Sequence, residues 1–138
     1  MRLTITGILI IGNAVSWAMA QSSWTVQNSG TNAPLYSVTW TGNQLVAVGE
    51  EIILTSPDGI NWTVRASMSP TFQCILNYVT WTGSQLVALD YEGAILTSPD
   101  GITWTTQQSG TRYPLTSVTW TGNKLVAVGA LGTILTSP

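Results

Sequence analysis

The sequence has no histidine, only one cysteine and few charged residues. Without histidine, catalytic triads built on an imidazole base and the commonest metal ligands are excluded, so no metal site and no cofactor are expected. Cys74 cannot form a disulfide within the chain, and we interpret it as a buried or unreactive thiol, with an intermolecular bridge as the alternative. Four basic residues in 138 are too few to neutralise many phosphates, so nucleic acid is not an expected partner.

The first twenty residues are typical of a secretory signal peptide. Arg2 gives a positive start, Leu3 to Ile11 is apolar, and Ala18-Met19-Ala20 has the small residues at which a signal peptidase cuts. Two glycines and an asparagine keep the apolar run shorter than the ~20 residues of a membrane span, although a membrane anchor stays the alternative. We expect a secreted or periplasmic protein that begins at Gln21 and has no membrane span.

The rest of the chain, 21–138, contains three copies of one pattern. Val-Thr-Trp-Thr-Gly recurs three times, and each copy is followed by Leu-Val-Ala and then by Ile-Leu-Thr-Ser-Pro. Trp40, Trp81 and Trp120 mark a period of 41 and then 39 residues. A period of this length indicates a repeat architecture. The three repeats fall at about 23–61, 62–103 and 104–138.

Each repeat contains four short runs of β-branched and aromatic residues separated by turn signals. In the first copy these runs predict strands at Tyr36–Thr41, Gln44–Val48, Ile52–Thr55 and Asn61–Arg65. The second run, Leu-Val-Ala-Val, does not alternate, so this strand should be covered on both faces. The fourth alternates and should be a half-exposed outer strand. The expected fold is therefore all-β, with four-stranded antiparallel β-propeller blades.

The turn after the third strand carries a resemblance to a known family. Ser56-Pro-Asp-Gly-Ile-Asn-Trp62 and Ser98-Pro-Asp-Gly-Ile-Thr-Trp104 resemble the Asp-box, or BNR, motif of sialidase-like propellers, Ser/Thr-x-Asp-x-Gly-x-Thr-Trp, and are one residue shorter between Asp and Trp. The whole unit is also similar to the repeats of photosystem II assembly-factor-like bacterial propellers. In that family the Asp-box is a structural turn. The resemblance thus implies a structural role for Ser56, Asp58, Gly59, Trp62, Ser98, Asp100, Gly101 and Trp104.

The number of repeats raises the question of ring closure, because propellers typically use four to eight blades. Ser23–Gln27 matches the fourth strand of a repeat, whereas the third repeat stops after its third strand, so the N-terminal segment is expected to complete the last sheet. Three arrangements fit: part of a longer propeller, two copies forming a six-bladed homo-oligomer, or a β-trefoil. The Asp-box and the doubly covered second strand favour the first two.

The turns of a meander alternate between the two ends of the sheet, and the copies differ at one end only. The turns between second and third strands, and the connections from one repeat to the next, differ in every copy, so a binding specificity would reside there. The aromatic and polar candidates are Tyr36, Glu50, Glu51, Phe72, Asp90, Tyr91, Glu92, Arg112 and Tyr113. The alternative is that these are ordinary solvated loops. The six recurring tryptophans are interpreted as packing residues rather than a sugar-binding surface.

The sequence contains no catalytic motif. Sialidase-type chemistry, which the resemblance raises, needs a cluster of arginines, a tyrosine with a glutamate partner and an acidic aspartate. After removal of the signal peptide only Arg65 and Arg112 remain. The sequence therefore predicts a noncatalytic binding or scaffold module for a protein or glycan partner. The alternative is a fragment of a sialidase-like glycoside hydrolase.

Overall fold

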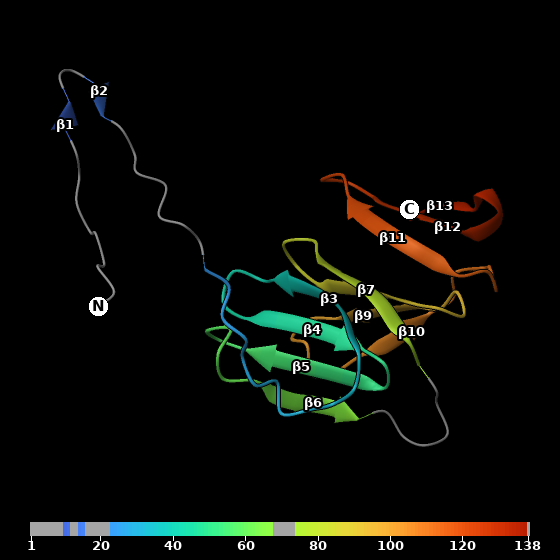
Figure 1. Ribbon diagram of the computed structural model, residues 1–138. Helices are drawn as coiled ribbons and strands as arrows, with labels where there is room; N and C mark the ends of the chain where they lie inside the picture. The colour runs from blue at the N-terminus through green and yellow to red at the C-terminus, as the bar shows by residue number, and fades with distance from the viewer. Residues whose placement is uncertain (1–9, 12–13, 16–22, 68–73, 138) are drawn as a thin grey trace.

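The computed structural model describes residues 10–11, 14–15, 23–67 and 74–137, and their regular structure is almost all β (Figure 1). Three separate antiparallel sheets follow one another along the chain. Their strands are β3 (Leu35–Trp40), β4 (Leu45–Gly49), β5 (Ile52–Ser56) and β6 (Thr63–Ser67) in the first sheet; β7 (Leu76–Trp81), β8 (Leu86–Asp90), β9 (Ile95–Ser98) and β10 (Thr105–Gln107) in the second; and β11 (Leu115–Trp120), β12 (Leu125–Gly129) and β13 (Ile134–Thr136) in the third.

Two further strands, β1 (Ile10–Ile11) and β2 (Ala14–Val15), pair with each other near the N-terminus. Most of the predicted signal peptide lies outside the described residues, so it stays a prediction. A short 3₁₀ turn, η1 (Ala130–Gly132), connects β12 to β13.

Each sheet is a simple meander, as the repeat pattern predicts. Neighbouring strands in the chain pair with each other, and the arrowheads of β4 and β6 point to one end of the first sheet while those of β3 and β5 point to the other (Figure 1). Most predicted strand ends lie within one residue of those observed. The fourth strand starts at Thr63 rather than Asn61, because the N–H of Asn61 donates to the Asp58 carboxylate, 2.8 Å, and so belongs to the preceding turn.

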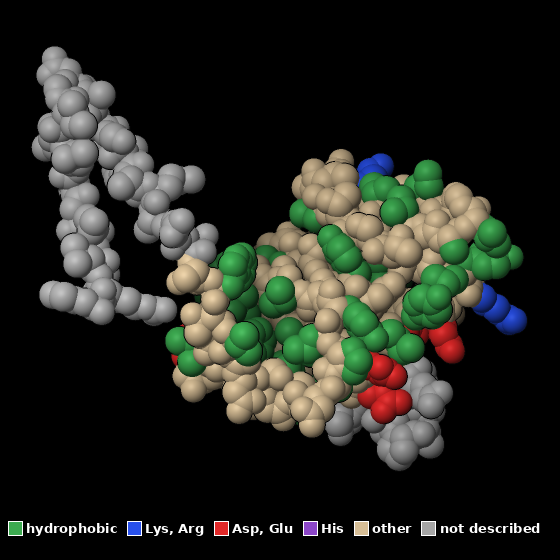
Figure 2. All heavy atoms as spheres, in the orientation of Figure 1, with side chains coloured by type: hydrophobic (Ala, Val, Ile, Leu, Met, Phe, Trp, Pro, Cys, Tyr) green, Lys and Arg blue, Asp and Glu red, His purple; other side chains and the backbone are tan. Residues whose placement is uncertain are grey.

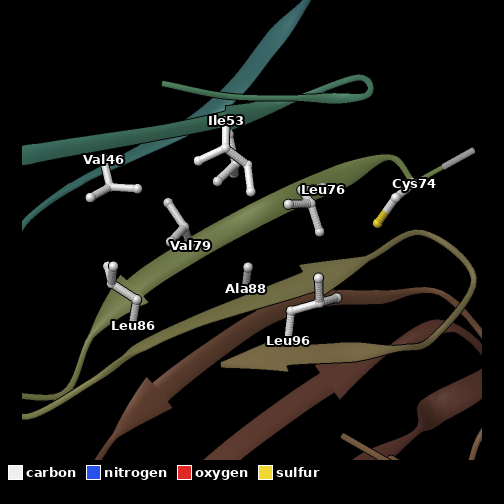
Figure 3. Close-up of a cluster of buried hydrophobic side chains, with 9 residues drawn as sticks. Val46, Ile53, Cys74, Leu76, Val79, Leu86, Ala88 and Leu96 are labelled. Carbon is white, nitrogen blue, oxygen red and sulfur yellow. The ribbon is translucent and has the colours of Figure 1, made fainter. Parts of the chain in front are cut away.

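The sheets stack face to face, and the core lies between them. Val46, Val48 and Ile53 of the first sheet are fully buried against the second, which contributes Leu76 and Val79. Figure 3 shows the side chains of this cluster filling the space between the two sheets. A second cluster between the second and third sheets comprises Val87, Leu89, Leu115, Val118 and Ala127. Because Ala33 and Trp62 pack on the other face of the first sheet, β4 and β8 are covered on both faces, as the unbroken Leu-Val-Ala runs predict. The prediction is wrong for the third copy, since only Ala127 of β12 is buried.

The expectation that Ser23–Gln27 completes the last sheet is wrong for a single chain. The third sheet has three strands, and Ser23–Gln27 forms none, with the Trp24 side chain 98% exposed. The reason is the connection that follows: Ala33 N–H donates to Thr31 Oγ1, 3.0 Å, and Glu50 N–H donates to Pro34 O, 3.0 Å. The second of these bonds joins the connection after Ser23–Gln27 to the first sheet, and the second sheet lies between the first sheet and the third.

The pairing also argues against the β-trefoil alternative. Within the described residues 23–67 and 74–137, each named strand pairs only with its neighbours along the chain, inside its own sheet. Three self-contained sheets stacked in chain order are the arrangement of propeller blades, although one chain does not show a closed ring.

Candidate functional site

The two ends of the stacked sheets are built differently. At one end lie the turns that recur, and at the other the turns that differ between repeats. Gln44, after the β3–β4 turn, donates its amide to Asp100 O in the β9–β10 turn, 2.9 Å. At the opposite end Tyr91 N–H donates to Ile75 O, 3.0 Å, so the β8–β9 turn contacts the connection between repeats. These bonds confirm the sequence-based grouping of the turns.

The Ser56–Trp62 turn of the first sheet is held together by its own side chains. Asp58 Oδ1 accepts the backbone N–H groups of Ile60, 2.9 Å, and Asn61, 2.8 Å, while Ser56 Oγ accepts that of Gly59, 2.9 Å. The hydrogen bonds from Asn61, and then that from Ile60, lower the pKa of Asp58 below its ordinary value. These contacts leave the carboxylate engaged within the turn. The Trp62 indole N–H donates to Gly59 O, 3.1 Å, and so fixes the start of β6.

The equivalent turn of the second sheet, Ser98–Trp104, repeats the serine and aspartate hydrogen bonds and also joins two sheets. Asp100 Oδ1 accepts from Thr103 and Ile102, both at 2.8 Å, which lowers its pKa, and Ser98 Oγ accepts from Gly101 N–H, 2.8 Å. A Cβ at Gly101 would lie 3.2 Å from a methyl group of Val46, so this turn lies directly against the first sheet. The half-buried Trp104 packs against the core cluster between the first two sheets.

At the variable end, each turn between second and third strands lies against the connections between repeats. Glu51 N–H donates to Cys74 O, 3.0 Å, and Glu50 forms an isolated antiparallel β-bridge with Ile75. A Cβ at Gly93 would lie 2.7 Å from Tyr113 O, so the connection that carries Arg112 and Tyr113 lies against the β8–β9 turn. Loops from all three repeats thus form one surface, which we call the loop face.

A hollow of about 340 Å³ opens on the loop face between the first two repeats. Tyr36 and Tyr91 line it together with Ile75 and Asn77. The two tyrosine side chains are 49% and 57% exposed. Asn77 is fixed from behind, because its Nδ2 donates to Leu115 O, 2.8 Å. The sequence identified both tyrosines but missed Ile75 and Asn77, although both lie in the connection between repeats that it singled out as variable.

Asp90 has a different setting from the other candidates. It is buried, and its Oδ1 accepts the Ile75 N–H, 3.1 Å. Burial raises the pKa of Asp90, although hydrogen bonds from Ile75 and Tyr91 oppose the shift. Burial likewise raises the pKa of the neighbouring Cys74 thiol to about 12, and the Asp90 charge adds to this. Asp90 therefore orders the loop, and Cys74 is a buried thiol as predicted.

The remaining candidates are spread around the hollow. Glu50, Glu51, Glu92, Arg112 and Tyr113 are exposed, and Phe72 lies outside the described residues. Figure 2 shows acidic side chains beside hydrophobic ones on the face in view, with few basic side chains. Within the described ranges, no group of three or more acidic, cysteine or histidine side chains could hold a metal ion. No helix in those ranges is long and apolar enough to cross a membrane.

Comparison with known proteins supports the fold alone. No family model matches the chain, and no curated protein matches it. The crystal structure of the mitotic checkpoint complex contains a chain with a propeller-like fold that is similar to this one, with a TM-score of 0.62 and 14% identity. The match covers 89% of this chain and 43% of that chain, so this chain spans less than half the length of its structural neighbour.

Proposed function

We propose that this chain is a noncatalytic binding module of BNR-type propeller repeats, which acts outside the cytoplasm and binds a glycan or protein partner on its loop face. The observation that carries the proposal is the hollow between Tyr36 and Tyr91. Tyrosine combines an apolar ring with a hydroxyl group, and exposed pairs of such rings suit both sugars and peptide side chains. Because Glu50, Glu51 and Glu92 are exposed at the same end, the partner is expected to be neutral or basic.

Two features support a noncatalytic role. The two arginines outside the predicted signal peptide lie in different places. Arg65 is in the first sheet, where its Nε donates to Thr55 Oγ1, 2.7 Å, whereas Arg112 is in the connection before the third sheet, near Gly93. The buried carboxylate of the loop face, Asp90, is occupied by backbone N–H groups. Neither arrangement gives the arginine cluster or the paired acids of glycoside hydrolysis.

The test is a screen of the purified chain against a glycan array and a panel of secreted proteins, followed by titration calorimetry with the strongest ligand. Tyr36→Ala and Tyr91→Ala should each weaken binding at least about tenfold, the loss expected for an aromatic anchor. Tyr113→Ala is the matched control, because Tyr113 is 51% exposed at the same end but does not line the hollow. Unchanged affinity in both tyrosine variants would overturn the site. Turnover of a glycoside by the chain would overturn the noncatalytic role.

A further inference from the structure

The same contact between sheets is built twice within the chain. We call one side of each sheet its front face: it is the side that bears the valine of the first strand, which is Val38 in the first sheet. The side that bears the third-strand isoleucine, Ile53 in the first sheet, is its back face. The back face of the first sheet packs on the front face of the second, and the back face of the second packs on the front face of the third.

Within the described residues, one face of each kind has no sheet packed on it. On the front of the first sheet Leu35, Val38 and Trp40 are exposed, whereas their equivalents Leu76 and Val79 in the second sheet are buried. On the back of the third sheet Val128 and Ile134 are exposed. These two surfaces are the two halves of the contact that the chain already makes twice, so they are complementary to each other.

Within the described residues, the third sheet has no tryptophan at the position that Trp62 and Trp104 occupy in the other two. Trp62 packs on Ala47 and Leu54 of the first sheet, and Trp104 occupies the same place in the second. In the third sheet the equivalent residues, Ala127 and Leu135, instead line a cavity of about 500 Å³ that is closed on its other side by Ile95 and Gln107. The cavity lies where the fourth-strand tryptophan of this sheet would sit.

The sequence of Ser23–Gln27 matches that of the fourth strands in the first two sheets. Trp24 precedes Trp40 by the same 16 residues that separate Trp104 from Trp120. The connections that follow fold alike: Thr31 N–H donates to Ser29 Oγ, 3.4 Å, and Thr111 N–H donates to Ser109 Oγ, 3.2 Å. A 98% exposed tryptophan in a strand-like sequence thus occurs in the same molecule as a cavity that has apolar side chains at Ala127 and Leu135 but no tryptophan.

We propose that two copies of this chain assemble head to tail. Ser23–Gln27 of one copy pairs with β13 of the second copy as its fourth strand, and Trp24 fills the cavity beside Ala127 and Leu135. The back face of the third sheet then packs on the front face of the other copy's first sheet. Because the contact joins two different surfaces, it can be made twice between two copies, which closes the pair.

The second sheet shows the pairing that the third would adopt. Thr105 lies opposite Thr97, and Gln107 Nε2 donates to Thr97 Oγ1, 3.1 Å. In the same register Thr25 lies opposite Thr136 of the second copy. Ser109 Oγ donates to Gly93 O, 2.5 Å, and the equivalent glycine, Gly132, has no neighbour around a Cβ position, so there is room for the incoming connection.

The charge of Lys124, at the edge of the proposed contact, also favours a second copy of the chain as the partner. Gln44 of the first sheet donates to the Asp-box of the second at Asp100. The third sheet has Lys124 at that position, and in the pair this residue would face the Asp-box of the second copy, at Asp58. An ammonium group beside a carboxylate-bearing turn favours this contact.

Association can be measured by light scattering and sedimentation of the purified chain over a range of concentrations. The mass should be that of two chains. Trp24→Ala should raise the dissociation constant of the pair at least about tenfold, because a buried aromatic anchor is lost. Lys124→Glu should raise the same constant several-fold. Tyr113→Ala should leave it unchanged. Trp24 and Lys124 are exposed, so neither change should unfold the monomer. A chain that stays monomeric, or a pair that Trp24→Ala does not weaken, would overturn the proposal.

The strand pairing is tested by the double variant Thr25→Cys/Thr136→Cys under oxidising conditions. Residues directly opposite in a sheet bring their Cβ atoms within reach of a disulfide. Cross-linked species of two chains should appear in the double variant and in neither single variant, in which Cys74 is buried. A link within one chain, or no link, would refute pairing between copies.

Discussion

Strands β4 and β12 have the same five-residue sequence, Leu-Val-Ala-Val-Gly, yet they differ in burial. In β4 every residue after Leu45 is buried, because the second sheet covers one face and Ala33 and Trp62 pack on the other. In β12 only Ala127 is buried, because within the described residues a sheet packs on one face of the third sheet only. The strand sequence is therefore suited to two covered faces, and the neighbouring sheets decide whether both are covered.

The difference in burial between β4 and β12 also implies a difference in the free energy that each strand contributes to folding. Each Å² of apolar surface removed from water contributes about 25 cal/mol to stability, so the apolar side chains of an uncovered face contribute little. The third sheet should then be the least stable part of the chain when it is alone, with a stability that depends on what covers it.

The largest effect that separates the two regions is expected for the third-strand isoleucines. Ile53 is 0% exposed and Ile134, at the same repeat position, is 69% exposed. Ile53→Ala should lower the free energy of unfolding by about 2–5 kcal/mol because it leaves a cavity. Ile134→Ala should change that of the dilute monomer by no more than about 0.5 kcal/mol. Urea unfolding of both variants measures this, and equal losses would show that the sheets do not stack as described.

A smaller effect on stability is expected at Asp90, the residue at which the second sheet differs from the other two. Strand β8 ends in Asp90, while β4 and β12 end in glycine. Because burial raises the pKa of Asp90 above its unfolded value, the charged form destabilises the fold at neutral pH, and stability is gained as pH falls through the folded pKa. Asp90→Asn, which can still accept the Ile75 N–H, should be more stable than the parent at pH 7, with a difference that shrinks as pH falls. Thermal unfolding at a series of pH values measures the difference. A stability difference that widens as the pH falls would mean that hydrogen bonds to the Asp90 carboxylate affect its pKa more than burial does.

The sequence predicted the repeated parts of the fold because they are set by local chemistry. The Ser-Pro-Asp-Gly turn closes through its own side chains, as in Ser56 and Asp58, and the Leu-Val-Ala run forms the second strand of all three sheets. The position of Ser23–Gln27 could not be predicted, since which sheet a strand joins depends on contacts far away in the chain.

For the candidate site, the sequence located the loop face but not its interior. Tyr36 and Tyr91 were identified as candidates because they differ between repeats. That they share a hollow depends on how the first two sheets stack. Asp90 was identified as a binding candidate because its turn differs between repeats, whereas in the structure it is buried and accepts the Ile75 N–H. Burial of this kind arises from the packing of loops, which no local pattern specifies.

The most direct test of this account is amide hydrogen exchange of the whole chain, resolved by strand and measured at low and high protein concentration. When dilute, β4 and β5 should exchange slowly, and β12 and β13 should exchange faster despite their matching sequences. At high concentration exchange in β13 and in Ser23–Gln27 should slow together. Equal protection of β5 and β13 at every concentration would contradict the claim that covering by a neighbouring sheet determines the stability of each repeat.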